Sequence, residues 1–204
     1  MLTLPPEISK KFSTILIFGA PGSGKGTQGR FLSSAGNHYH LSSGDIFRGL
    51  APDSLAGKRF YSYASQGRLV PDQLTVEIWY HFVMGLIATN RYFPEKQLLL
   101  LDGMPRTQQQ AEILDSYLEV KTIILLKSKS NGFLVQRLKK RALIERRFDD
   151  SDEEVLKKRI ELYEREIPPI LAHYSKEQIV SFDAEMRPLE VLRDILISLC
   201  QLLS

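Results

Sequence analysis

The chain has 204 residues and a mass of 23.3 kDa, which suits a single domain. Hydrophobic residues make up 43% of it and aromatic residues 9%, enough for a sizeable core. This composition excludes disorder over the whole length as well as collagen-like and coiled-coil structure. Because 27 basic residues face 24 acidic ones, the formal net charge is only +3, and this balance indicates no general affinity for nucleic acid or acidic membranes.

Cys200 is the only cysteine, so an internal disulfide and a cysteine-rich zinc site are excluded. We expect Cys200 to be a core residue of an apolar helix. Pro5 and Pro6 interrupt the segment where a secretory signal would need an apolar core. The longest apolar stretch, residues 74–88, is too short and too polar to span a bilayer. We therefore expect a cytoplasmic protein. The four histidines, His38, His40, His81 and His173, do not have the spacing of metal ligands, and we expect them to be structural.

Short apolar runs alternate along the chain with segments of helical periodicity. The strands expected in chain order are 14–18, 97–101, 121–126 and 178–182. The helices expected in chain order are 24–34, 73–89, 108–119, 131–141, 152–167 and 187–203. Strands separated by helices need crossover connections, which predict an α/β fold with a mostly parallel sheet covered by helices on both faces. Such sheets bind ligands beyond the carboxyl ends of their strands.

The first expected strand is followed by a glycine-rich segment, GAPGSGKGT at residues 19–27, and then by a helix. Gly19, Gly24 and Lys25 have the spacing of a phosphate-binding loop in its required context. The glycines let backbone N–H groups approach phosphate oxygens, and the helix adds its positive N-terminal end. Lys25 would supply a mobile charge to the β- and γ-phosphates. Gly26 stands where the general pattern has Ser or Thr.

This form of the loop is typical of nucleoside monophosphate kinases, and the chain resembles the adenylate kinase family from about residue 14 to 199. Four further segments follow in the family's order, at 41–48 (LSSGDIFR), 67–72 (GRLVPD), 101–111 (LDGMPRTQQQA) and 137–159. The resemblance implies one P-loop kinase domain, 1–204, with a P-loop NTPase-type parallel sheet. It also implies a small helical monophosphate-binding subdomain at about 42–72 and a short lid at about 141–151.

The second and third segments resemble the part of the family that binds AMP, the acceptor nucleotide. Ser43 stands where the family usually has Thr, and it keeps the hydroxyl group. Arg48 matches an arginine that binds the acceptor's phosphate, a role that suits a forked guanidinium. Taken alone, this segment would be a turn, a helix cap and a surface arginine. The stretch that the resemblance places beside the acceptor base is Arg68, Leu69 and Val70.

The fourth segment follows the second expected strand. A carboxylate at a strand end can hold Mg²⁺ through water, and the resemblance implies this role for Asp102, with Thr27 as a second metal ligand. Arg106 matches a second arginine on the acceptor phosphate. Gln110 matches the amide that recognises adenine, since an amide offers both a donor and an acceptor. The other AMP-binding residues implied here are Gly103, Pro105 and Met104, which replaces the family's usual aromatic residue.

The fifth segment is strongly basic, with six Lys or Arg residues between positions 137 and 147 and Glu145 alone opposing them. Such a run is typical of a solvated surface or a nucleic-acid site. However, Asp149 and Asp150 follow at once, and the aromatic interleaving of single-strand binders is missing. The segment resembles the family's short lid, which leaves no room for a zinc-binding subdomain. Arg146 replaces the family's usual Gly, and residues 147–159 span one residue more than usual.

The resemblance implies the activity of that family: transfer of a phosphoryl group from ATP·Mg²⁺ to AMP, giving two ADP, in line and under a closing lid. We expect a monomer that uses Mg²⁺ and no zinc, with no nucleic-acid or membrane partner. The implied catalytic residues are Lys25, Asp102, Arg106, Arg147 and Arg159. The implied ATP-binding residues are Gly22, Ser23, Gly24, Lys25, Gly26, Thr27, Arg137, Arg141 and Met186. Arg147 and Arg159 also belong to the implied AMP site, and Asp149 and Asp150 would orient the lid.

Two alternatives stay open at this point. A UMP/CMP kinase shares the fold and mechanism, although Gln110 and the hydroxyl of Ser43 favour AMP. A non-catalytic nucleotide-binding or adaptor protein of the same fold is the other alternative. Retention of Lys25, Asp102 and the matched arginines argues against it.

Overall fold

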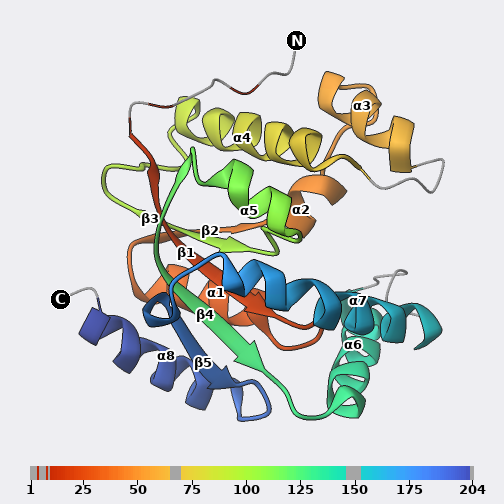
Figure 1. Ribbon diagram of the computed structural model, residues 1–204, viewed down its shortest axis with the longest axis vertical. Helices are drawn as coiled ribbons and strands as arrows, with labels where there is room; N and C mark the ends of the chain where they lie inside the picture. The colour runs from red at the N-terminus through yellow and green to blue at the C-terminus, as the bar shows by residue number, and fades with distance from the viewer. Residues whose placement is uncertain (1–3, 5–7, 9, 65–69, 146–152, 203–204) are drawn as a thin grey trace.

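A computed structural model describes residues 4, 8, 10–64, 70–145 and 153–202 (Figure 1). Its five strands are all parallel and form one sheet in the order β2-β3-β1-β4-β5. The strands are β1 Phe12–Gly19, β2 His38–Ser42, β3 Leu98–Asp102, β4 Leu118–Lys127 and β5 Ile179–Asp183. The helices are α1 Lys25–Ala35, α2 Ser43–Arg48, α3 Leu55–Ala64, α4 Asp72–Ala88, α5 Gln108–Leu114, α6 Asn131–Glu145, α7 Glu153–Ala172 and α8 Pro188–Leu202, with a short 3₁₀ helix at Lys176–Gln178.

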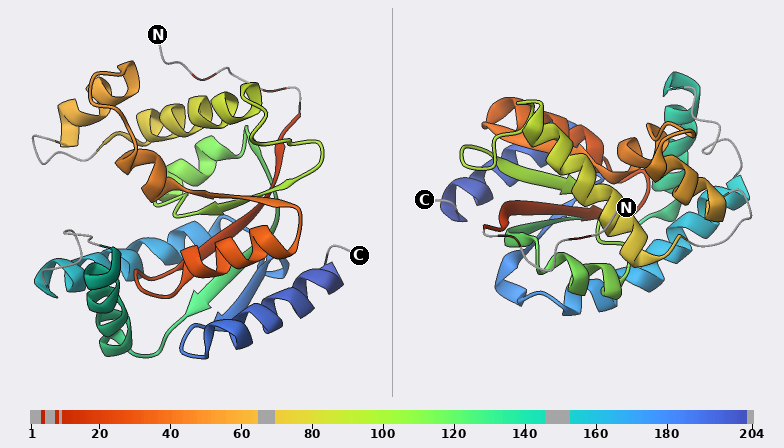
Figure 2. Two further views of the ribbon diagram at one scale, coloured as in Figure 1. Left: turned by 180° about the vertical axis from the view of Figure 1, so that it is seen from behind. Right: turned by 90° about the horizontal axis from the view of Figure 1, so that it is seen from above.

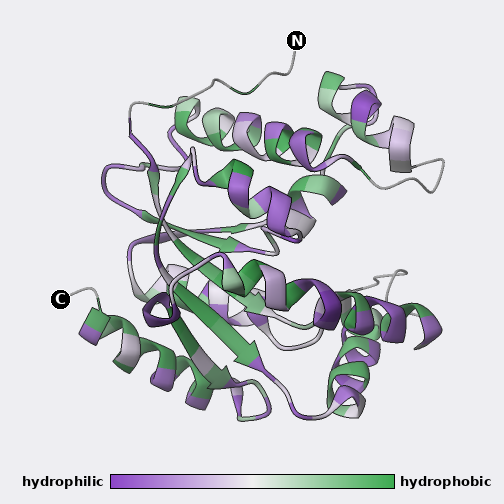
Figure 3. Ribbon diagram, viewed as in Figure 1, coloured by the Kyte–Doolittle hydropathy of each residue, from purple (hydrophilic) through white to green (hydrophobic). Residues whose placement is uncertain are grey.

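The predicted α/β fold is confirmed, because helices cover both faces of this sheet. Side chains of β1 alternate between the faces: Leu16 and Phe18 pack toward α4 and α5, while Ile15 and Ile17 pack toward α1 and α8. Figure 1 shows α5 and α7 in front of the sheet, and the rear view in Figure 2 shows α1 and α8 on the other side. The three inner strands, β3, β1 and β4, are apolar along most of their length (Figure 3), as strands covered on both faces must be.

Two further groups of helices lie at the carboxyl ends of the strands. α6 and α7 pack on each other through Leu134, Leu138, Leu156 and Ile160, and this small core also holds Ala20 of the glycine-rich loop. α2 and α3 follow β2 and pack together through their aromatic rings, Phe47 stacking on Phe60 at 5.3 Å between centroids. The range 42–72, predicted as a subdomain, contains α2 and α3, and the range 141–151, predicted as a lid, begins within α6. Residues 141–145 continue helix α6.

β2 is the strand that periodicity missed. Its sequence, HYHLS, lacks a continuous apolar run, because it is an edge strand that pairs only with β3 and is mostly half-buried. The boundary between α5 and β4 was also wrong. The helix ends at Leu114 rather than 119, and β4 starts at Leu118 because Leu118 and Glu119 extend the pairing with β1.

Helix α7 runs past its expected end at residue 167 to Ala172, with Pro168 and Pro169 inside it. The expectation that Cys200 is a core residue was wrong, since its side chain is exposed. α8 buries Val191, Ile195 and Leu199, a stripe four residues apart, and the position after Leu199 turns away from it. Within the described ranges, no helix has both the length and the apolar character needed to cross a membrane.

Candidate active site

Most of the predicted site residues that the structure describes lie at one edge of the sheet. Parallel strands end on the same side, so the loops that follow them meet there. The glycine-rich loop follows β1, Ser43 follows β2, and Asp102 ends β3. The loop after β4 leads into α6, which carries Arg137 and Arg141, and the loop after β5 carries Met186.

The glycine-rich loop places Lys25 at the first residue of helix α1. Gly24 has φ +98°, which favours glycine, and a Cβ there would lie 3.2 Å from Nη2 of Arg137. No side chain caps the helix, so its first N–H groups are left for a ligand. The Lys25 ammonium folds back and donates to the carbonyl oxygens of Gly19 and Ala20 at 2.6 and 3.2 Å.

The surroundings of Lys25 show that the predicted cations converge. Burial lowers the pKa of Lys25; the carboxylate of Asp102 partly offsets this, and the charges of Arg106, Arg141 and Arg159 lower the pKa further. These arginines come from the β3–α5 loop, from α6 and from α7. The fold has therefore brought four like charges near one carboxylate, and a further anion bound among them would be stabilised by the excess of positive charge.

Arg106 links this cluster to the acceptor side. Burial and the charge of Arg159 lower its pKa, Asp102 opposes the shift, and Arg48 adds to it. Arg106 Nε donates to the carbonyl of Gly103 at 2.9 Å, and Nη2 donates to the hydroxyl of Ser43 at 3.3 Å. Five cations and one carboxylate thus act on one another across the edge of the sheet.

Ser43 is fully buried and connects β2 to the loop after β3. Its hydroxyl donates to the Gly103 carbonyl at 2.8 Å while accepting from Arg106. Gly103 has φ +83°, and a Cβ there would lie 2.6 Å from the Ser43 oxygen. The close approach therefore requires glycine at 103. Arg48, one helical turn further on, pairs with Asp45 at 2.6 Å on the surface.

Asp102 is 7% exposed and faces the glycine-rich loop. A Cβ on Gly26 would lie 3.7 Å from its Oδ2, so the missing side chain at 26 leaves space between the loop and the carboxylate. His40 Nε2 lies 3.7 Å from the same oxygen, too far for a hydrogen bond. Periodicity and spacing predicted no role for His40, and its proximity to Asp102 became visible only when β2 paired with β3.

Gln110 is 5% exposed, and both ends of its amide are engaged. Oε1 accepts from the backbone N–H of Arg106 at 2.8 Å, and Nε2 donates to Asp72 Oδ1 at 2.7 Å. The backbone N–H of Gln110 donates to the hydroxyl oxygen of Thr107, which thereby caps the start of helix α5. Asp72 was predicted only as the last residue of the 67–72 segment, with no role of its own, and its partner Gln110 lies 38 positions further along the chain.

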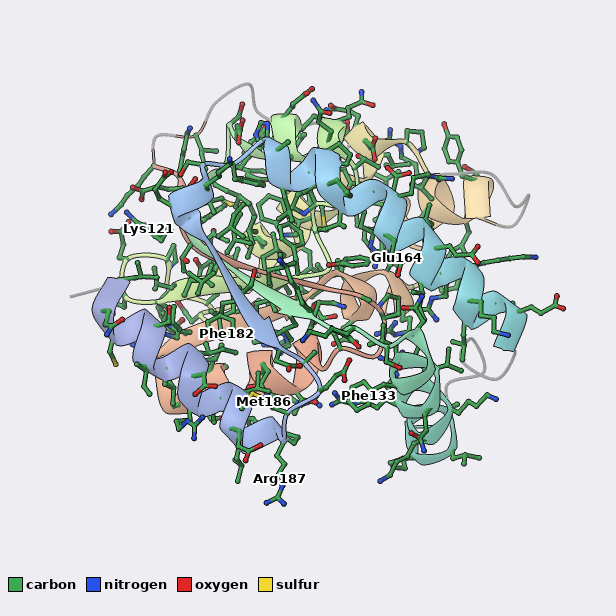
Figure 4. The ribbon with its side chains drawn as sticks, turned by 60° about the horizontal axis from the view of Figure 1, so that its bottom comes forward. Lys121, Phe133, Glu164, Phe182, Met186 and Arg187 are labelled. Carbon is green, nitrogen blue, oxygen red and sulfur yellow. The ribbon has the colours of Figure 1, made fainter. Side chains whose placement is uncertain are left out.

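On the opposite side of the glycine-rich loop, the guanidinium of Arg137 has three neighbours. Its guanidinium lies 5.2 Å above the ring of Phe133, one turn earlier in α6, and Nη1 donates to the carbonyl of Ala184 at 3.1 Å. The third neighbour is Gly24. Figure 4 shows Phe133 and Met186 on neighbouring elements at this end of the molecule, far from Lys121. Burial lowers the pKa of Arg137.

Glu185 was missed by sequence reasoning and fixes the two loops beside Arg137 to each other. Its carboxylate accepts from the Ser128 hydroxyl at 2.8 Å and from the backbone N–H groups of Lys129 and Ser130 at 2.7 and 3.1 Å. These hydrogen bonds lower its pKa, the Ser128 bond most strongly. The loop that carries Met186 is thereby anchored to the start of α6.

Several predicted residues are placed differently from the rest or lie outside the described ranges. Met104 is fully buried, and its side chain packs in the main core rather than toward the cluster. Val70 also packs against that core. Those outside the described residues are Arg68, Leu69, Arg146, Arg147, Asp149 and Asp150.

The fold and the glycine-rich loop define a protein of the P-loop NTPase type, in which three arginines interact with the lysine at the end of that loop. The family model described as Adenylate kinase matches residues 17–179. The chain is 37% identical over 169 residues to an adenylate kinase of Flavobacterium johnsoniae, covering 80% of this chain and 85% of the relative. It is 34% identical over 175 residues to adenylate kinase isoenzyme 1 of Homo sapiens, covering 85% of this chain and 87% of the relative.

A third relative, an adenylate kinase of Rhodopirellula baltica, is 35% identical over 171 residues, with 81% of this chain and 83% of the relative covered. The chain belongs to the adenylate kinase family. The resemblance stated from five motifs is therefore confirmed over most of the chain.

Proposed function

We propose that this protein is a nucleoside monophosphate kinase that transfers the terminal phosphoryl group of ATP to AMP, forming two molecules of ADP. The observation that carries the proposal is the convergence of Arg106, Arg141 and Arg159 on Lys25 at the end of the glycine-rich loop. Two nucleotides that meet head to head bring a dense negative charge, and this cluster supplies the positive charge to hold it.

On the donor side, the backbone of residues 22–27 would hold the β- and γ-phosphates, with Lys25 following the transferred group. Arg141 would bind the donor phosphates. Arg137 would lie beside the donor base, between the glycine-rich loop and the Ala184 carbonyl that already fixes it. Contacts from Met186 to the base would run through its backbone.

On the acceptor side, Arg48 and Arg106 would bind the phosphate of AMP. Gln110 would recognise adenine, beside the hydroxyl of Ser43 and the backbone of Gly103. The remaining residues of the proposed AMP site are Val70, Met104, Pro105, Arg159 and, outside the described ranges, Arg68, Leu69 and Arg147. For Met104 the contribution would come from the backbone, because its side chain is buried in the core.

The chemistry needs position and charge rather than a base. An oxygen of the AMP α-phosphate is already ionised and attacks the γ-phosphorus in line, while the bond from that phosphorus to the β–γ bridging oxygen breaks. Lys25, Arg106 and Arg159 would stabilise the negative charge on the oxygens of the phosphoryl group during its transfer. No phosphorylated enzyme forms in this scheme.

The residues present fit a magnesium ion. Asp102 offers a nearly buried carboxylate toward the space above Gly26, and Thr27 offers a hydroxyl in the first turn of α1. Mg²⁺ prefers oxygen ligands and keeps several of its waters, so one carboxylate reached through water suits it. When bound with ATP, the ion would neutralise part of the phosphate charge.

We propose that residues of about 42–72 form the acceptor subdomain and 141–151 the lid, in a monomer that acts in the cytoplasm on ATP, AMP and ADP. Closure of both segments would exclude water, which would otherwise accept the phosphoryl group. Asp149 and Asp150 would hold the lid arginines in place.

The test is a coupled assay of ADP formation with ATP·Mg²⁺ and, separately, AMP, CMP, UMP and GMP. Turnover with AMP far above the other acceptors is the expected result. Turnover mainly with CMP or UMP would keep the mechanism and overturn the acceptor. ATP binding without turnover on any acceptor would place the protein among non-catalytic nucleotide binders.

A further inference from the structure

The amide of Gln110 is held in one orientation by two partners of opposite kind. The backbone N–H of Arg106 can only donate, and it lies 2.8 Å from Oε1. The ionised carboxylate of Asp72 can only accept, and its Oδ1 lies 2.7 Å from Nε2. If the amide turned over, a donor would face a donor and an acceptor would face an acceptor. Because Gln110 is 5% exposed, water cannot readily replace either partner.

A fixed amide presents its remaining groups in a fixed order. One N–H and one lone pair of the carbonyl oxygen are left after the two internal hydrogen bonds. An aminopurine such as adenine has an exocyclic donor beside a ring acceptor, whereas a 6-oxopurine has an exocyclic acceptor beside a ring donor. An amide free to turn over would accept either edge, and a locked amide discriminates between them.

We propose that Asp72 is a specificity-determining positioning residue: by locking the amide of Gln110, it makes the acceptor site select a 6-aminopurine monophosphate over a 6-oxopurine monophosphate. This inference rests on the proposed function, in which Gln110 faces the acceptor base. Asp72 does not touch the base in this scheme. It acts through Gln110, from the first residue of α4 to the first turn of α5.

Asp72 is the partner that a substitution can remove, since the other is a backbone group. Asp72→Asn is nearly isosteric, and its amide can donate or accept, so one of the two constraints on Gln110 is lifted. The ratio of kcat/KM for AMP over inosine monophosphate should fall about tenfold, the size expected when a hydrogen bond to a charged group no longer opposes the flipped state. Asp72→Glu keeps an acceptor-only group and should retain more of the discrimination than Asp72→Asn.

A matched control is available on the same helix. Glu112 accepts from the side-chain amide of Gln108 at 3.0 Å, the same pair of groups on the exposed face of α5. Glu112→Gln should leave the ratio unchanged. Urea unfolding of every variant identifies a general loss of structure, which would lower both kcat/KM values without changing their ratio. Should Asp72→Asn not fold, Asp72→Ser, whose hydroxyl also donates and accepts, provides the same test.

The proposal is overturned if the folded Asp72→Asn variant keeps the ratio of the unmodified protein, if Glu112→Gln lowers it equally, or if the unmodified protein does not discriminate. Calorimetric titration with AMP and with inosine monophosphate separates this result from the proposed function. If the protein binds AMP selectively but forms no ADP, the proposed reaction is wrong. Loss of that binding selectivity in Asp72→Asn would still support the role of Asp72.

Discussion

The ammonium of Lys25 interacts with the charges of three arginines, and within the described part of the chain its hydrogen bonds go to two carbonyl oxygens. Such an arrangement does not favour the free protein, because the one carboxylate nearby, that of Asp102, is outnumbered by the cations and only partly offsets the cost of burying the ammonium. It suits a site whose ligand is an anion. The position of Lys25 is therefore explained by the phosphates it would bind rather than by folding.

Replacing one of the two central cations should abolish most of the turnover. Lys25→Met and Arg106→Ala should each lower kcat by at least ~10²-fold, comparable to the loss of one preorganised charge-stabilising donor. The coupled ADP assay measures the effect. Lys121→Met is the control, because Lys121 lies near the opposite end of β4 and pairs with Glu119 there. Near-normal turnover of either site variant would contradict the proposed roles.

The lowered pKa of Lys25 predicts a pH dependence of donor binding. Bound phosphates stabilise the ammonium and raise its pKa, so above the lowered pKa of the free protein, ATP binds only with uptake of a proton. The dissociation constant for ATP should then rise by up to about tenfold per pH unit, starting below the ordinary lysine value of 10.5. Calorimetry between about pH 7 and 10 would reveal both the rise and the proton uptake. Lys25→Arg stays charged throughout, so a profile equal to that of the unmodified protein would refute the explanation.

At the scale of elements, α3 is tied to α4 by an ion pair that is unequally exposed. Arg59 Nη1 lies 2.8 Å from Oε2 of Glu77, whose side chain is 10% exposed against 42% for Arg59. Without the ion pair, water could solvate the guanidinium of Arg59 but could reach the carboxylate of Glu77 only in part, so losing the pair destabilises Glu77 more. This contact joins the helix pair after β2, in the expected acceptor subdomain, to the main core.

Removing Arg59 should cost more stability than removing both partners. Arg59→Met leaves the nearly buried Glu77 without this ion pair and should lower the free energy of unfolding by about 1–3 kcal/mol. Adding Glu77→Gln removes the charge that needs the pair and should restore part of the loss. Urea unfolding of the single and double variants tests this, with Lys58→Met, an exposed neighbour on α3, as control. A double variant as unstable as the sum of the single ones would contradict it.

At the scale of the whole molecule, one core joins Phe12 of the first strand to helices as far along the chain as α7, which contributes Ile170. Trp79 of α4 is fully buried in it, with its ring 6.2 Å from that of Phe12 in β1, in an edge-to-face arrangement. Its indole N–H has no hydrogen-bond partner within the described ranges. The side chain therefore stabilises the fold by packing and area alone.

Trp79→Ala should lower the free energy of unfolding by about 3–5 kcal/mol, since a large cavity would open between α4 and the sheet. Trp79→Phe should cost much less, because it keeps an aromatic ring and removes a buried donor without a partner. Chemical unfolding measures both values. Phe82→Ala on the same helix, at a position 39% exposed, should change stability little. Equal losses in the two Trp79 variants would contradict this view of the core.

The sequence by itself determined the α/β class, four of the five strands, the glycine-rich loop and the order of the motifs. These features depend on local rules: apolar runs that are buried on both faces, glycines where the backbone must approach a ligand, and helices between parallel strands. β2 was not predicted, because an edge strand can be polar and then lacks the apolar run by which the other strands were found. The end of α5 was predicted wrongly, because residues 118 and 119 pair with β1, a long-range contact that overrides their helical pattern.

Only the tertiary structure decided which residues act on one another. Lys25 and Arg159 are far apart in the chain, yet they interact because β1, α6 and α7 meet at one edge of the sheet. The contact of Asp72 with Gln110 and that of Arg137 with Ala184 likewise join separate elements. Side-chain hydrogen bonds need about 3 Å between heavy atoms, and charge interactions are largely screened beyond about 10 Å, so the packing of elements, and not their spacing in sequence, selects the partners.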